Sequence, residues 1–143
     1  MPDVLDFRVL ARGVLVAGVA LALVGCGKAS TNVRVDGQIV WADGSPARDL
    51  AGFVVESTVP GSRVTARGMV DGEGRFRLGT DRPGDGAEPG SHQVAINPVP
   101  RFEYEPPPPV TLPERYGRPE TSGLTLTAEP GKASRVTLTV SRE

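Results

Sequence analysis

The sequence predicts an all-β fold, a β-sandwich of seven short strands. Of its 143 residues, 18 are glycine and 14 are proline, a composition that suits short strands joined by many turns and opposes a helical fold. In several segments apolar and polar residues alternate with a period of two, the pattern of a strand with one buried face. No segment shows a convincing helical period. Seven alternating strands separated by frequent turns favour a sandwich.

The first predicted strand covers residues 33–41, where Val33, Val35, Ile39 and Trp41 share one parity. This parity predicts that Trp41 belongs to the core and is not a platform on which a sugar stacks. The other predicted strands cover residues 53–55, 63–70, 75–78, 94–96, 124–126 and 136–140.

Turn-forming residues separate these strands. Residues 71–74 (Asp-Gly-Glu-Gly) and 129–132 (Glu-Pro-Gly-Lys) are typical of tight hairpins, because glycine adopts positive φ without steric cost. Residues 81–90 predict a polar loop. Residues 97–120 contain eight prolines, and this insert cannot lie in a central sheet because proline lacks the backbone donor that a sheet requires.

An apolar segment precedes the predicted sandwich. Arg8 and Arg12 form a short positive region, and residues 13–25 are uncharged and apolar. That length suits the hydrophobic region of a signal peptide and falls short of the about 20 residues that a membrane-spanning helix needs. The run ends in Leu23-Val24-Gly25-Cys26, and a small polar segment follows.

Residues 8–26 resemble the leader of bacterial lipoproteins. The resemblance implies that cleavage falls between Gly25 and Cys26 and that lipid is attached to Cys26. A cysteine suits this step because its thiolate is a strong nucleophile, and two or more acyl chains hold a protein stably at a membrane. The alternatives are an ordinary secretory leader and an uncleaved membrane helix. We expect a lipoprotein signal peptide over residues 1–25, a polar tether over 26–32 and one domain over 33–143.

Three stretches of this domain resemble the carboxypeptidase regulatory-like, or transthyretin-like, domain, an Ig-like sandwich. They are residues 37–46 (GQIVWADGSP), 70–78 (VDGEGRFRL) and 89–96 (PGSHQVAI). The stretches Pro113–Tyr116 and Thr121–Leu124 resemble small lipoproteins of the planctomycete type. Because these motifs are turn and strand residues, the resemblance implies a fold and hardly any activity.

Charge and residue types exclude several function classes. The net charge of −1 gives no electrostatic reason to expect nucleic acid as a partner. His92 is the only histidine and Cys26 the only cysteine, so the usual zinc ligand sets are missing. A catalytic triad has no base unless His92 serves. We expect His92 to be a hydrogen-bonded strand histidine, and we expect no cofactor, no metal and no enzyme activity.

The acidic loop residues are candidates for a calcium site that their spacing does not favour. These are Asp71, Glu73, Asp81, Asp85 and Glu88. They do not match the spaced acidic ladder of a calcium loop, and Asp71-Gly72 is explained by turn geometry.

The Pro-rich insert holds the candidates for contact with a protein partner. They are Phe102, Tyr104, Pro106, Pro107, Pro108, Pro109 and Tyr116. Four consecutive prolines favour a stiff polyproline II segment, which can dock in an aromatic groove. The alternative, which we favour, is a passive spacer with Tyr116 packed on the sandwich.

Together these features predict a lipoprotein anchored to a membrane through Cys26 and facing the periplasm or the cell surface. The expected role is that of a non-catalytic structural or protein-interaction module with an envelope protein as its partner. The alternative is a periplasmic carrier that binds a small ligand or carbohydrate between the loops.

Overall fold

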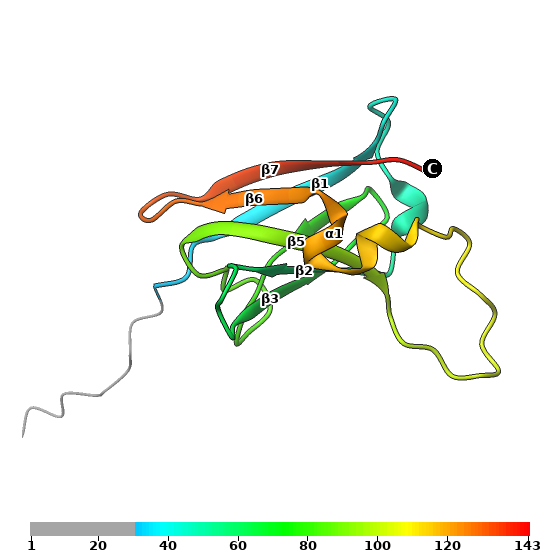
Figure 1. Cartoon of the computed structure of the whole chain (residues 1–143), viewed down its shortest axis with the longest axis horizontal. Coiled ribbons are helices and arrows are strands. Elements are labelled where there is room, and N and C mark those ends of the chain that lie inside the picture. The colour runs from blue at the N-terminus through cyan, green and yellow to red at the C-terminus, as the bar shows by residue number, and fades with distance from the viewer. Residues whose placement is uncertain (1–30) are drawn as a thin grey trace, which may run out of the picture.

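Two β-sheets pack against each other in the residues that the structure, a computed structural model, describes, which are residues 31–143 (Figure 1). The all-β class that the sequence predicts is confirmed, and the two-sheet arrangement is consistent with a sandwich. The predictions on the signal peptide, Gly25 and Cys26 lie outside the described residues.

One sheet has three strands and the other has four. The smaller has the order β4-β1-β7, and the larger has the order β3-β2-β5-β6. The strands are β1 (Val35–Trp41), β2 (Phe53–Thr58), β3 (Thr65–Met69), β4 (Arg75–Arg77), β5 (Gly90–Pro98), β6 (Leu124–Ala128) and β7 (Ser134–Val140). Among the strands of residues 31–143, only β1 and β7 pair in parallel, and the other strand pairs are antiparallel.

The core lies between the sheets because each strand turns alternate side chains inward. Trp41 is only 4% exposed, as its parity predicts. Gly37 of β1 leaves room for the ring of Phe76, its neighbour on β4, which lies directly over it. A Cβ atom added at Gly37 would come within 2.1 Å of the Phe76 ring. The largest fully buried side chains include Ile39, Leu50, Leu78, Ile96, Val35, Val55, Val70, Val94 and Val140.

Both turns predicted as hairpins carry the chain from one sheet to the other. The turn 71–74 follows β3 of the larger sheet and precedes β4 of the smaller one, and the turn 129–132 connects β6 to β7 in the same way. At 71–74 the flanking segments still pair in part, because the backbone N–H of Asp71 donates to the carbonyl of Arg75 and Arg67 forms an antiparallel bridge with Gly79. The prediction of paired neighbours is wrong at 129–132, where β6 pairs with β5 and β7 pairs with β1. The local turn chemistry holds at the first: Gly74 has φ +74°, and the Asp71 carboxylate accepts the backbone N–H groups of Glu73 and Arg75 at 2.8 and 2.9 Å.

The Pro-rich insert contains more regular structure than its composition predicts. The strand expected at residues 94–96 begins at Gly90 and continues to Pro98, which forms the last pair of β5 with Phe53. Proline is tolerated there because the ladder ends at that point. Short helical turns follow at η2 (Glu114–Gly117) and α1 (Pro119–Ser122), and another, η1 (Arg48–Leu50), follows β1.

The described chain enters the sandwich at one end, and the Pro-rich loop (residues 99–113) leaves it at the other. Val33 pairs with Ala87, shortly before Gly90 begins β5, whereas the loop begins after Pro98 ends it (Figure 1). The nine residues of β5 separate these ends by roughly 26 Å, at about 3.3 Å per residue. No helix among residues 31–143 is long and apolar enough to cross a membrane.

Candidate functional site

The Pro-rich loop presents two exposed aromatic rings. Phe102 is 68% and Tyr104 83% exposed, and their rings stack with centroids 5.6 Å apart and planes 4° from parallel. Two large exposed aromatic side chains side by side form an apolar surface of the kind that protein interfaces use as anchors. The structure therefore brings these two predicted contact residues together.

The returning arm of the loop is fixed on the sandwich. Val110 and Leu112 pack against the core, and Pro108 is partly buried beside them. Together with Phe53 and Ile96 they line an apolar hollow of about 220 Å³. The guanidinium of Arg101 donates to the carbonyl of Pro106 and closes the tip of the loop. The aromatic pair is thus carried on an anchored loop, with Pro106, Pro107 and Pro109 exposed next to it.

Tyr116 does not belong to this exposed surface, and its assignment as a partner contact is corrected. It lies in η2, is 4% exposed and belongs to the core. Its hydroxyl accepts hydrogen bonds from the backbone N–H of Ser141 at 2.9 Å and from Arg115 at 3.0 Å. Burial acts to raise the pKa of Tyr116, but the hydrogen bonds from Ser141 and Arg115 outweigh it and lower the pKa below 10.0. Tyr116 joins the end of the insert to the end of β7.

His92 is buried in β5 and has a hydrogen-bond partner at each ring nitrogen. Nε2 lies 2.8 Å from the carbonyl oxygen of Glu88 and Nδ1 lies 2.8 Å from the hydroxyl of Ser57. Because a carbonyl only accepts, Nε2 carries the proton, and in the neutral ring Nδ1 accepts from the Ser57 hydroxyl. This is the arrangement of a nucleophile and its base, formed by residues 35 positions apart, which sequence analysis did not pair.

The Ser57–His92 pair is sealed from solvent. Ser57 is 0% and His92 1% exposed, and neither side chain lines the hollow beneath the Pro-rich loop. A nucleophile must reach its substrate, so this pair serves as a satisfied polar contact between β2 and β5. The strand histidine that the sequence predicts is what the structure contains.

The acidic loops use their carboxylates to hold turns together. Asp85 accepts the backbone N–H groups of Thr80, Asp81 and Arg82 at 2.6, 3.2 and 3.0 Å, and these bonds, led by that from Thr80, lower its pKa. Asp71 caps its own turn in the same way. In residues 31–143 no three histidine, cysteine or acidic side chains gather in a geometry that holds a metal ion.

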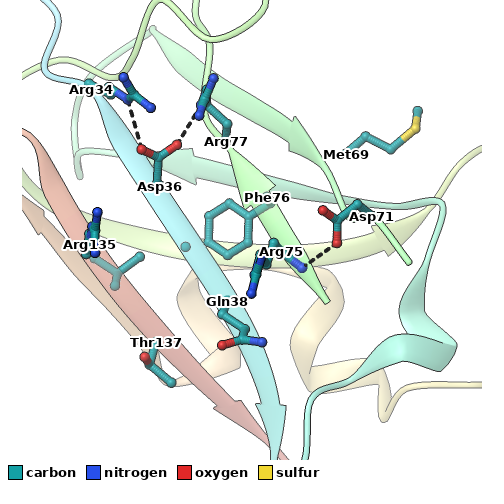
Figure 2. Close-up of a pocket in the computed structure, with 12 residues that line it drawn as sticks. Arg34, Asp36, Gln38, Met69, Asp71, Arg75, Phe76, Arg77, Arg135 and Thr137 are labelled. Carbon is teal, nitrogen blue, oxygen red and sulfur yellow. Dashed lines mark hydrogen bonds and ion pairs between the residues drawn. The ribbon is translucent and has the colours of Figure 1, made fainter. Parts of the chain in front are cut away.

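A polar face that sequence analysis missed lies on the outer side of the three-stranded sheet, and we call it the arginine face. Figure 2 shows its side chains around a shallow, open depression of about 740 Å³. Its charged residues are Arg34, Asp36, Asp71, Arg75, Arg77 and Arg135. The register places Arg77, Asp36 and Arg135 side by side on adjacent strands, and Arg75, Gln38 and Thr137 in the next row.

Asp36 occupies the centre of the arginine face. Its two carboxylate oxygens accept Nε–H of Arg77 at 2.6 Å and Nε–H of Arg34 at 2.8 Å (Figure 2). The hydrogen bond from Arg77 is the main cause that lowers the pKa of Asp36, and the bond from Arg34 adds to it against the effect of partial burial. The carboxylate is therefore ionised near neutral pH and fixes two guanidinium groups.

No protein-family model, curated protein or solved structure matches this chain. What the described residues define is a mostly β protein of two packed sheets, with an anchored aromatic loop at one end and an arginine-rich face along one side.

Proposed function

We propose that this chain is a bacterial envelope lipoprotein, held at a membrane by lipid on Cys26, whose sandwich contacts a protein partner through the Pro-rich loop without catalysis. The observation that carries the proposal is the placement of the loop. It leaves the sandwich at the end away from Val33, where the segment that would carry the lipid enters. A domain tethered in this way holds Phe102 and Tyr104 away from the membrane surface.

The exposed aromatic pair supports a role in binding a protein partner more than a role in packing within the fold. Phe102 and Tyr104 are the most exposed large hydrophobic side chains in the described part of the chain. Exposed apolar area is costly in water, and aromatic anchors are enriched where proteins meet. The stacked geometry and the bond between Arg101 and Pro106 reduce the conformational entropy that binding would otherwise cost.

The resemblance to the carboxypeptidase regulatory-like, or transthyretin-like, domain is part of this proposal. Its three stretches coincide with β1 and the following turn, with the turn before β4, and with β5. The sealing of Ser57 and His92 from solvent supports a module that does not catalyse a reaction. The alternative, a carrier that binds a small ligand or carbohydrate between the loops, has in its favour the hollow beneath the Pro-rich loop. At about 220 Å³ it is smaller than the about 300–1,000 Å³ of typical ligand sites.

Lipid attachment is tested by feeding labelled palmitate to cells that express the protein. We expect label on the wild type and none on Cys26→Ser, which should also leave the membrane fraction. Label on Cys26→Ser would refute the anchor.

The role of the loop is tested by chemical crosslinking in intact cells, comparing two double variants. Phe102→Ser/Tyr104→Ser removes the exposed pair, and Val64→Ser/Met69→Ser removes two other exposed apolar side chains, which are 39% and 64% exposed. We expect the crosslinked adduct to disappear only in the first variant. An adduct that persists without the aromatic pair, or that both variants lose, would refute the contact.

A further inference from the structure

The arginine face carries more positive charge than its acidic residues neutralise. Four arginines and two aspartates line it, in a chain whose net charge is −1. One of the aspartates, Asp71, is engaged by the backbone N–H groups of its own turn. A surplus of positive charge is thus concentrated on one face of a slightly acidic protein.

Most hydrogen-bond donors of these arginines remain free. Arg34 and Arg77 each use only Nε–H to bind Asp36, which leaves their terminal amino groups without a partner among residues 31–143. The side chain of Arg135 forms no hydrogen bond or ion pair within the same described range, and the side chain of Arg75 interacts only electrostatically with Asp71. Guanidinium groups bind carboxylates in bidentate fashion, so the face offers several such positions.

Asp36 fixes these donors in space. Because its carboxylate holds both Arg34 and Arg77, less side-chain entropy is lost when an anion binds to their outer edges. The row Arg77–Asp36–Arg135 crosses three strands, so its two outer arginines stand roughly 10 Å apart at about 4.8 Å per strand. A single small anion does not span that distance, whereas a polymer with repeated negative charges does.

The polarity of the face indicates the kind of polymer. Gln38 and Thr137 add polar groups in the second row, and Phe76 is buried beneath the sheet (Figure 2). Met69 is the exposed apolar side chain at the rim. Protein partners usually insert apolar anchors into a closed pocket. The depression on the arginine face is open and rich in hydrogen-bond donors, and within residues 31–143 it contains no such closed pocket. We propose that the arginine face binds an anionic polysaccharide whose sugar units carry carboxylates.

Alginate, a polymer of carboxylated sugars, is the probe for this proposal. We expect the full chain in detergent to bind immobilised alginate and not neutral dextran, and to release it as sodium chloride rises. The double variant Arg75→Gln/Arg135→Gln removes two arginines that hold no other part of the fold. It should weaken alginate binding by about tenfold or more, a loss of about 1.4 kcal/mol or more, because charge-assisted hydrogen bonds to the carboxylates are lost.

The matched control is Arg63→Gln/Arg118→Gln, which removes the same charge from two exposed positions outside the face. It should change the affinity less than about twofold. The proposal is overturned if the wild type does not bind alginate, or if both double variants weaken binding equally. It is also overturned if polyglutamate binds as tightly as alginate, because the face would then recognise acidic polymers of any backbone. Thermal unfolding of all variants should match that of the wild type.

Discussion

The Ser57–His92 pair provides the sharpest test of how the two central strands of the larger sheet are held together. Both side chains are buried and bonded at 2.8 Å. Replacing Ser57 by alanine leaves Nδ1 of His92 without a donor, at a cost of about 1–3 kcal/mol. Replacing His92 by phenylalanine leaves the Ser57 hydroxyl and the Glu88 carbonyl unpaired, so the cost is roughly 2–5 kcal/mol.

The double variant Ser57→Ala/His92→Phe should lose less than the sum of the single losses. Removing both partners leaves only the Glu88 carbonyl unsatisfied, at about 1–3 kcal/mol, so the coupling energy should be about 2–5 kcal/mol. These losses are large against a typical total stability of about 5–15 kcal/mol.

Urea unfolding followed by tryptophan fluorescence measures all four proteins. The single tryptophan, Trp41, is buried and donates to Asp49 at 2.9 Å, so its emission reports the folded core. Additive losses, with a coupling below about 0.5 kcal/mol, would refute the hydrogen bond. In the same samples a fluorophosphonate probe should leave Ser57 unlabelled in the folded protein; labelling would contradict its sealed position.

Three further perturbations test the packing and the charges. Gly37→Ala should destabilise by about 1–3 kcal/mol in thermal unfolding, because its Cβ would collide with the Phe76 ring; an unchanged midpoint would contradict the contact. Tyr116→Phe should cost about 1–2 kcal/mol through the lost acceptor, and a neutral effect in urea would argue against it. The ion pairs hold the pKa of Asp36 below 3.8, so the folded state binds fewer protons in acid than the unfolded state. The contribution of ionised Asp36 to the free energy of unfolding is complete above about pH 4, and it is lost as the pH falls through the lower pKa of Asp36 in the folded state. Asp36→Asn should therefore flatten the acid limb of a stability-versus-pH curve measured by urea unfolding; an unchanged slope would contradict this.

Local patterns predicted the strands well, because the alternation of apolar and polar residues in a strand involves only consecutive residues. The parity of Val35, Ile39 and Trp41 marks one face of β1 without any tertiary information. The same patterns failed at residues 129–132, where the turn chemistry is local but the choice between pairing and crossing depends on the opposite sheet.

The sites depended on contacts that sequence spacing does not reveal. Ser57 and His92 meet because β2 and β5 pair. Arg77 and Arg135 flank Asp36 only through the register of three strands that are distant in the sequence. Tyr116 was grouped with Phe102 and Tyr104 because all three surround the prolines, yet packing against the core decides its environment. The exposure of Phe102 and Tyr104 was predictable, because the prolines around them keep this segment out of the sheets.

Photocrosslinkers placed at opposite ends of the domain test the proposed orientation of the sandwich at a membrane in intact cells. A photoreactive amino acid in place of Tyr104 lies on the exposed loop, and one in place of Lys132 lies in the turn between β6 and β7, beside the entering chain. We expect a protein adduct from position 104 and labelled lipid from position 132. Lipid adducts from position 104, or protein adducts from position 132 alone, would contradict the proposed orientation.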